Sequence, residues 1–289
     1  MKSIITSDQH WHSFKEFDRL TDEGKSYRLS LYEKSHEFIR QYCQKNGITS
    51  WIDAGDIFHS RESISLPVLD AIGRQLNHSK SIGIDMIFLM GNHDTHNKSG
   101  NITSLNVLSQ YGAVITKRCI SKLNSIDSPL VHFIPWDESI QFVNSINENE
   151  KTSLVVSHRM LKGAKSNNII LDGESLEGLD DSKFDCALIG HVHEYQKIQD
   201  KVYYIGSLIS NNFNDKNQDK GFLVYDFELK KFERITNPHS PKYVPIKIST
   251  QKEFDDIKQE MKSSPEKFFD IRYEVQDGPW AHPAVTLPF

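Results

Sequence analysis

Five short stretches of the chain carry side chains that commonly bind metal ions, and each directly follows an apolar run: "SDQH", "GDIFH", "GNHD", "SH" and "GHVH". Their aspartate, asparagine and histidine residues are Asp8, His10, Asp56, His59, Asn92, His93, Asp94, His158, His191 and His193. Imidazole nitrogens mixed with carboxylate or amide oxygens suit Mn, Fe or Zn rather than Ca or a thiolate site. The residue types therefore indicate a metal centre with nitrogen and oxygen ligands.

As many as seven candidate ligands are too many for one tetrahedral ion and suit two ions that share a carboxylate. Asp56 is short and central among the stretches, so it is the best candidate for the bridge. Two ions roughly 3.5–4 Å apart can clamp a phosphate group and activate water. With Asp8 and Asp56 as the only carboxylates among the ligands, two divalent ions keep the pocket cationic, and it fits an anionic phosphoester.

Each stretch taken alone has an ordinary explanation. A lone histidine at the end of a strand is more often a structural residue, and aspartate or asparagine after a strand is usually part of a turn. The glycines before Asp56, Asn92 and His191 could equally be plain turn glycines. Chance does not readily explain why five consecutive strand ends all supply nitrogen or oxygen ligands.

The elements that must position these side chains are short strands alternating with helices. Runs rich in Ile and Val predict strands at 3–6, 50–53, 84–90, 153–157 and 186–189, while apolar spacing predicts helices at 27–47, 65–83 and 100–112. This alternation indicates an α/β core, in which the carboxyl ends of the strands form the ligand-binding edge. The scattered ligands are therefore predicted to converge.

The C-terminal part of the chain follows a different pattern. Strands are predicted within 201–208, 221–229 and 230–236 without intervening helices, which suggests a second, more antiparallel sheet, with the two sheets sandwiched between helices. After a proline-rich stretch, a strand–helix–strand unit is expected over 246–275. We divide the chain into a main domain at 1–240, a partial capping domain at 241–275 and an irregular tail at 276–289.

Composition narrows the class of protein. The 289 residues carry a net charge of −5, so the whole protein does not attract nucleic acid, and local charge or a partner must do so. Three widely spaced cysteines imply no disulfide framework. The sequence shows neither a signal peptide nor an apolar run long enough for a membrane span. We expect a cytoplasmic protein, in the host cell if a phage encodes it.

The five stretches resemble, in order, the five motifs of the calcineurin-like metallophosphoesterases, over residues 7–193. This resemblance implies a four-layer αββα sandwich with two metal ions. One ion would be held by Asp8, His10, Asp56 and His193, and the other by Asp56, Asn92, His158 and His191. Mn²⁺ is the expected metal, with Mg²⁺, Fe²⁺ and Zn²⁺ as alternatives. His93 would act as the acid beside the leaving group, and Asp94 would orient it.

The second motif narrows the resemblance. Phosphoprotein phosphatases have Gly-Asp-x-x-Asp-Arg there, whereas this chain has "GDIFHSR", with His59 in place of the aspartate and Ser60 in place of the arginine. That motif resembles the SbcD-type nucleases of DNA repair and recombination, and His59 would contact the phosphate or position the strand. The segments "YYIGSLISNNFND" and "KGFLVYDFE" and the strand–helix–strand unit also resemble that family.

The SbcD-type resemblance implies DNA as substrate, a coiled-coil ATPase of the SbcC type as partner, and a homodimer formed through helices near 66–78 and 101–111. The family's ATPase-binding helices after the cap are not evident in this sequence. One rival interpretation is a phosphoesterase acting on nucleotides or on cyclic or small phosphodiesters. Another is a non-enzymatic scaffold, which the complete ligand set disfavours.

Overall fold

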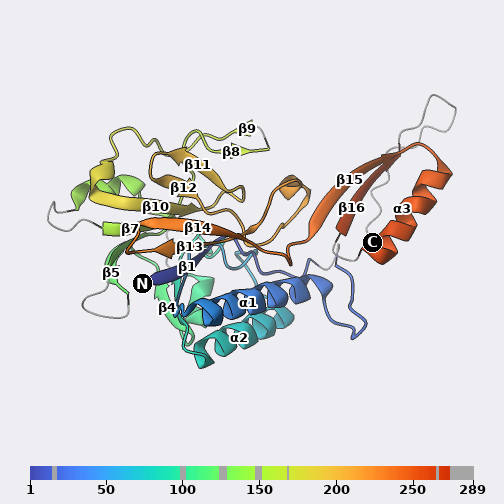
Figure 1. Ribbon diagram of the computed structural model, residues 1–289, viewed down its shortest axis with the longest axis horizontal. Coiled ribbons are helices and arrows are strands. Elements are labelled where there is room, and N and C mark those ends of the chain that lie inside the picture. Colours follow the sequence, from blue (N-terminus) through green and yellow to red (C-terminus); the bar gives the residue numbers. More distant parts are fainter. Residues whose placement is uncertain are drawn as a thin grey trace.

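The computed structural model describes residues 1–14, 18–97, 102–123, 129–146, 152–167, 169–264 and 267–273. Two six-stranded sheets pack face to face, with helices α1 and α2 against the outer face of one of them (Figure 1). A smaller strand–helix–strand unit extends from one end of this sandwich (Figure 1). In the described residues, no helix is both long and apolar enough to cross a membrane.

The first sheet has the order β14-β13-β1-β2-β3-β4. Its strands are β1 (Lys2–Thr6), β2 (Ser50–Asp53), β3 (Asp85–Leu89), β4 (Gly112–Ile115), β13 (Gly221–Asp226) and β14 (Lys231–Thr236). β1 to β4 run parallel, β13 pairs antiparallel with β1, and β14 pairs antiparallel with β13 at the edge. The carboxyl ends of β1, β2 and β3 therefore lie next to one another.

The second sheet has the order β11-β12-β10-β7-β6-β5. Its strands are β5 (Cys119–Lys122), β6 (Leu130–Ile134), β7 (Thr152–His158), β10 (Phe184–Gly190), β11 (Gln196–Gln199) and β12 (Val202–Tyr204). β6, β7, β10 and β12 are parallel, whereas β5 and β11 are antiparallel edge strands. A hairpin of β8 (Lys165–Ser166) and β9 (Ile169–Ile170) lies outside this sheet.

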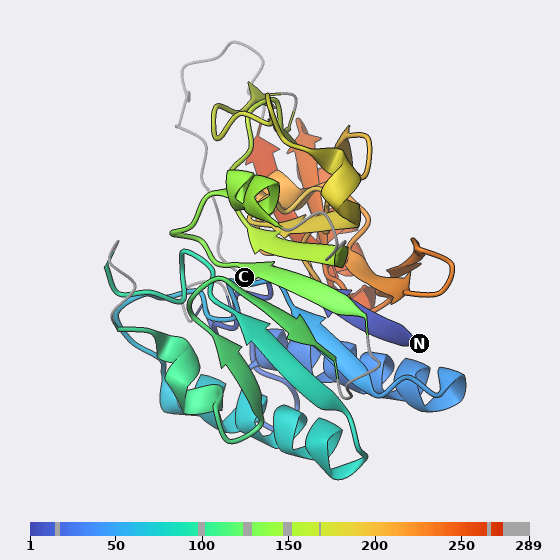
Figure 2. The same ribbon diagram turned by 90° about the vertical axis from the view of Figure 1, so that its left-hand side faces the viewer.

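Three apolar layers hold the sandwich together. The layer between the sheets includes Ile5, Leu89, Val156 and Leu188, all fully buried. α1 (Tyr27–Asn46) and α2 (Leu66–Ser81) cover the first sheet, and the 3-10 helix η2 (Ile140–Ser145) covers part of the second (Figure 2). The predicted four-layer arrangement is confirmed, with 3-10 turns and loops in place of long helices on one side.

The capping unit consists of β15 (Lys242–Ile248), α3 (Gln251–Ser263) and β16 (Lys267–Tyr273), with the two strands parallel. Thr250 and Glu253 form a capping box at the start of α3. β15 contacts the 3-10 helix η4 (Phe213–Asp215) of the main sandwich. The expected strand–helix–strand order is present, and its status as a separate domain stays a prediction; the tail at 276–289 lies outside the described residues.

Two predictions are wrong. Residues 102–112 form the 3-10 helix η1 (Ser104–Leu108) and the start of β4 rather than a helix over 100–112. The hydroxyl of Thr103 accepts from the amide of Leu105 and donates to the carbonyl of Asp94, which ties this segment to a neighbouring loop. The C-terminal strands form no sheet of their own, because β12 joins the second sheet while β13 and β14 join the first.

Candidate metal centre

The candidate ligands lie at the carboxyl ends of five strands, β1, β2 and β3 of one sheet and β7 and β10 of the other. Beyond β1, the amides of Asp8 and His10 donate to the carbonyls of Gly55 (2.9 Å) and Asp56 (3.0 Å), so the two loops stay paired past their strands. The strand ends from both sheets meet at one edge of the sandwich, as the sequence pattern predicts.

Four of the candidate ligand residues have a left-handed backbone conformation. The φ angles are 51° at Asp8, 50° at His10, 59° at Asp56 and 96° at His191. Non-glycine residues adopt this region rarely, although aspartate and histidine tolerate it better than most. Such conformations persist where the surrounding structure over-determines them, as they often do at functional sites.

Gly91 permits the loop after β3 to lie directly against Asp56. A Cβ atom at Gly91 would overlap the carboxylate and the amide nitrogen of Asp56. In the space so gained, the amide of His93 donates to Oδ1 of Asp56 at 2.7 Å. Gly91 is therefore more than a turn residue, because its missing side chain lets two loops approach each other closely.

A first ligand group consists of Asp8, His10 and His193. Their ligand atoms all lie within 4.8 Å of one another. Nε2 of His10 lies 3.1 Å from Nε2 of His193, and Oδ1 of Asp8 lies 4.0 Å and 3.9 Å from these two nitrogens. All three residues are in the set that the family resemblance implies for one metal ion.

A second ligand group consists of Asp56, Asn92, His158 and His191. Oδ1 of Asn92 lies 3.1 Å from Nε2 of His158 and 2.7 Å from Nδ1 of His191, while Oδ2 of Asp56 lies 3.4 Å from Nε2 of His158. Oδ2 of Asp56 is also 3.7 Å from Nε2 of His10 in the first group. Asp56 thus lies between the two groups, where a bridging ligand is needed.

The donor set fits divalent cations. Nitrogens of His10 and His193 face each other at 3.1 Å, and each can direct a lone pair into the space between them. The two groups offer imidazole nitrogens with carboxylate and amide oxygens, which is the donor chemistry of Mn, Fe or Zn. The seven side chains could therefore hold two ions, with Asp56 common to both.

The electrostatic environment differs among the histidines of the two groups. Burial lowers the pKa of His10 well below its ordinary value, and burial together with His158 lowers the pKa of His191 to about 3. Burial also opposes charge on His158, but the neighbouring Asp56 carboxylate outweighs it and raises the pKa of His158 to about 9. Although burial disfavours its charge, nearby imidazoles hold the pKa of Asp56 below its ordinary value.

Hydrogen bonds fix several ligands from behind. Nδ1 of His158 donates to the carbonyl of Ala54 at 2.8 Å, which leaves Nε2 for a metal ion. The carboxylate of Asp8 accepts from the hydroxyl of Ser7 at 2.6 Å and from the amide of His191 at 3.0 Å. The bond from His191 joins the two sheets directly at the centre.

His93 has a different orienting partner from the one predicted. Its Nδ1 donates to the carbonyl of His59 at 2.6 Å. The carboxylate of Asp94 instead accepts backbone amides, among them those of Asp56 (2.7 Å) and Gly91 (3.0 Å). Asp94 therefore holds the two loops together, and the expectation that it orients the His93 ring is wrong.

His59 lies on the edge of the first ligand group. It forms, with His10 and His93, a third cluster whose ligand atoms lie within 4.8 Å of one another. The rings of His59 and His93 stack at 5.6 Å with an interplanar angle of 26°. Burial and the neighbouring imidazoles, His12 first among them, lower the pKa of His59 to about 4. These imidazoles form one wall of the centre.

Two tryptophans near the motifs, Trp11 and Trp136, occupy different environments. Trp11 is 1% exposed and stacks on Tyr32, so it is not available to a base. Trp136 is partly buried, and its ring lies 4.8 Å from that of His191. Trp136 therefore borders the second ligand group.

Sequence reasoning missed a buried polar network beneath the centre. Oε1 of Gln9 bonds with the ring nitrogens of His36 (2.8 Å) and Trp11 (2.9 Å), and Nε2 of Gln9 donates to Asp53 at 2.6 Å. Asp53 also accepts the amide of Gly55, at the turn before Asp56. The signal was weak, because Gln9 lies inside the first motif but Asp53 precedes the second motif and His36 lies in helix α1.

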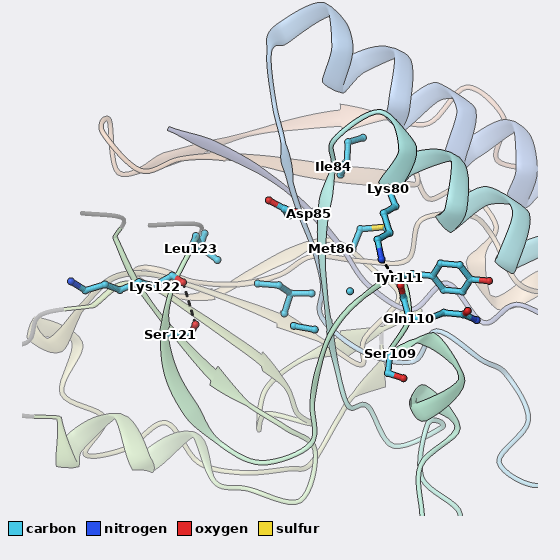
Figure 3. Close-up of a pocket in the computed structure, with 13 residues that line it drawn as sticks. Lys80, Ile84, Asp85, Met86, Ser109, Gln110, Tyr111, Ser121, Lys122 and Leu123 are labelled. Carbon is cyan, nitrogen blue, oxygen red and sulfur yellow. Dashed lines mark hydrogen bonds between the residues drawn. The ribbon is translucent and has the colours of Figure 1, made fainter. Parts of the chain in front are cut away.

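A cavity of about 410 Å³ lies away from this centre (Figure 3). Its lining includes Asp85 at the start of β3, Gly112 at the start of β4, and Lys122 at the end of β5. Because these are the amino ends of β3 and β4, the cavity is at the other end of the sandwich from the ligand groups. We assign it no part in the chemistry of the centre.

Known proteins with similar sequences include components of nucleases and a putative phosphoesterase. Exonuclease subunit 1 of Enterobacteria phage T4 is 28% identical over 208 residues, which cover 68% of this chain and 58% of that protein. The SbcD component of the nuclease SbcCD from Staphylococcus epidermidis is 23% identical over 303 residues, covering 90% and 75%. Putative phosphoesterase 244L of Invertebrate iridescent virus 6 is 26% identical over 213 residues, covering 70% and 73%.

Among solved structures, a dimetal phosphatase from Danio rerio covers 78% of this chain and 91% of its own, with 11% identity and a TM-score of 0.42. The family model for calcineurin-like phosphoesterases matches residues 1–195, which include both ligand groups and all five predicted motifs. The chain therefore belongs to the calcineurin-like phosphoesterase family and is a metal-dependent hydrolase of phosphoester bonds.

Proposed function

We propose that the protein is a dimetal-dependent DNA nuclease with Mn²⁺ as its metal. The observation that carries this proposal is the cluster of His10, His59 and His93 beside the first ligand group. Two relatives, one named as part of an exonuclease and the other as part of a nuclease, support a nucleic-acid substrate. The match covers only 58% of the length of the phage protein. The substrate of the present chain is therefore part of this proposal.

Two arginines near the centre, Arg28 and Arg159, are already engaged, and this favours a phosphodiester over a phosphomonoester. A monoester carries a second negative charge, for which a free guanidinium is the best partner. Arg28 is buried and donates to the hydroxyl of Tyr243 and the carbonyl of Asn211, and Arg159 is paired with Glu174. With these arginines engaged, the wall of imidazoles suits the single charge of a diester.

The proposed ligands are Asp8, His10, Asp56 and His193 for one ion and Asp56, Asn92, His158 and His191 for the other. Ions bound there would supply Lewis-acid polarisation of the phosphate and a lowered pKa for water.

His93 is the proposed general acid. Because the carbonyl of His59 fixes a proton on Nδ1 of His93, the opposite nitrogen, Nε2, is the one that can deliver a proton to the leaving oxygen. The His59 ring, stacked on His93, would contact the phosphate and limit how the strand enters. Asp94 would keep the loops of Asp56 and Gly91 in place through its backbone contacts.

End-labelled single- and double-stranded DNA, incubated with Mn²⁺ and the purified protein, tests this function. We expect metal-dependent cleavage that EDTA abolishes and that His93→Gln reduces. Exonuclease action would give a ladder that starts at the label or a single labelled nucleotide, and endonuclease action would cut circular DNA. Inactivity on every DNA, with and without a coiled-coil ATPase of the SbcC type, would overturn the proposal.

The alternative is a phosphoesterase acting on nucleotides or on cyclic or small diesters. The partly buried Trp136 beside His191 gives this alternative a surface for a single nucleobase. Parallel assays on bis(p-nitrophenyl) phosphate, cyclic nucleotides and linear DNA decide between the two, since a nuclease prefers DNA by kcat/KM. Homodimer formation through α2 and η1, where Leu66 and Val107 are exposed, also stays a proposal, which sedimentation velocity tests.

A further inference from the structure

A buried carboxylate lies behind the ring of His193. Oδ1 of Asp215 is 3.5 Å from Nδ1 of His193, whereas Nε2 of His193 faces His10 in the first ligand group. Asp215 is 4% exposed. A ring nitrogen that faces a carboxylate carries the proton, so the lone pair of His193 is on Nε2 and directed at the other ligands.

Asp215 is itself held by a buried ammonium group. Nζ of Lys220, which is 2% exposed, donates to Oδ1 of Asp215 at 2.9 Å and to the carbonyl of His193 at 2.7 Å. The amide of Asn211 donates to Oδ2 of Asp215 at 2.7 Å. Because each charge in this pair is matched and hydrogen-bonded, the carboxylate can stay ionised in a buried position. Lys220 also fixes the backbone of the histidine that Asp215 orients.

The other oriented histidines of the centre have neutral partners. Nδ1 of His158 donates to a backbone carbonyl, and so does Nδ1 of His93. Nδ1 of His10 is buried and has no hydrogen-bond partner in the part of the chain that the structure describes. A carboxylate partner makes an imidazole a stronger donor to a metal ion than a carbonyl does. His193 therefore differs from His158 and His93 in that its Nδ1 faces a charged carboxylate instead of a backbone carbonyl.

We propose that Asp215, held by Lys220, is a positioning residue that fixes His193 for metal binding in the first ligand group. Both residues lie beyond the stretch at 1–195 that matches the family. The inference rests on the proposed two-metal centre and is independent of the substrate. It predicts that loss of the carboxylate weakens one of the two metal sites and leaves the other intact.

Calorimetric titration of the chelator-treated protein with Mn²⁺ tests the inference. We expect two ions in the wild type. Asp215→Asn is expected to lower the affinity of one site by about 10–100-fold, the usual effect of losing such a partner, with the second site unchanged. Asp215→Glu keeps the charge and is expected to recover part of the loss. Asp226→Asn, at the far end of β13, is the matched control and should bind like the wild type.

Three results would overturn the inference: a wild-type isotherm for Asp215→Asn, equal weakening of both sites, or a glutamate variant no better than the asparagine variant. Failure of the wild type to bind Mn²⁺ would instead overturn the two-metal proposal. If Asp215→Asn does not fold, ¹⁵N spectra of the histidine rings in the metal-free wild type decide. His193, assigned with His193→Gln, is expected to carry its proton on Nδ1, and the Nε2-protonated tautomer would contradict the proposal.

Discussion

The two sheets contribute different chemistry to the same centre. The first sheet supplies every proposed oxygen ligand, through the loops after β1, β2 and β3, together with one imidazole from His10. The second sheet supplies imidazoles alone, at the end of β7 and after β10. Neither sheet carries a complete ligand set, so the centre exists only when the sheets are packed in register. Metal binding therefore reports on the packing of the whole sandwich.

The largest effect on metal binding is expected from Asp56→Asn, because this change removes the carboxylate that lies between the two ligand groups. Oδ2 of Asp56 lies 3.7 Å from Nε2 of His10 and 3.4 Å from Nε2 of His158, so its charge serves both groups. We expect both ions to be lost on desalting, a larger effect than the roughly 10–100-fold weakening typical of an outer partner. Metal analysis by mass spectrometry measures this. Retention of one ion would show that Asp56 is not the bridge.

His93→Gln separates proton transfer from metal binding. We expect the rate of phosphodiester cleavage to fall by about 10²–10⁴-fold with both ions retained, because a general acid typically contributes that much. Single-turnover assays at saturating Mn²⁺ give the rate. His96→Gln, on the exposed part of the same loop, is the matched control and should keep full activity. Full activity of His93→Gln would remove His93 from the proposed acid role.

Gly190→Ala forces the two sheets apart at the centre. A Cβ atom there would overlap Ser7, lie 2.6 Å from the carbonyl of Ala54 and lie 2.7 Å from Nδ1 of His158. We expect the free energy of unfolding to fall by about 1–3 kcal/mol, the usual effect of overpacking, together with weaker Mn²⁺ binding.

Chemical denaturation of the metal-free protein measures the stability loss in Gly190→Ala. Gly73→Ala in α2 is the control, because its Cβ would meet only the hydroxyl end of Tyr111. Helix propensity favours alanine there, so this control should not be destabilised. Equal stability of the two variants would contradict the close packing at Gly190.

The smallest effect distinguishes two serines that precede ligands on opposite sheets. The hydroxyl of Ser7 donates to Asp8 at 2.6 Å, whereas the buried hydroxyl of Ser157 has no partner among the described residues. Ser7→Ala should weaken one metal site by about 5–10-fold, since a hydrogen bond contributes roughly 1 kcal/mol. Ser157→Ala should leave both sites unchanged. Calorimetric titration measures both, and equal behaviour would show that the bond to Asp8 has no influence on the metal.

The sequence predicts the centre better than it predicts the frame around it. Each ligand follows an apolar run, and the rule that parallel strands share a carboxyl edge is enough to bring the ligands together. The pairing of β13 with β1, which adds β13 and β14 to the first sheet, is long-range, and local patterns do not encode it. The segment at 102–112 has helical spacing, but the bond from Thr103 to the carbonyl of Asp94 overrides it.

Within the centre, the sequence pattern identifies ligand types but not their supporting partners. Adjacency in sequence suggests that Asp94 orients His93, yet adjacent side chains diverge, and the carboxylate accepts backbone amides instead. Asp215 reaches His193 from the loop that includes η4. No periodicity or motif spacing links these positions, so only the folded chain shows that they meet.

The left-handed backbone at Asp8, His10, Asp56 and His191 has a consequence for protein engineering. Glycine is the residue best suited to such φ angles, and each departure from glycine disfavours the folded chain to some degree. A redesign guided by stability alone would therefore rank glycine highly at four positions where the chemistry requires a ligand. Improvement of this fold and preservation of its catalyst are opposing design goals at those four residues.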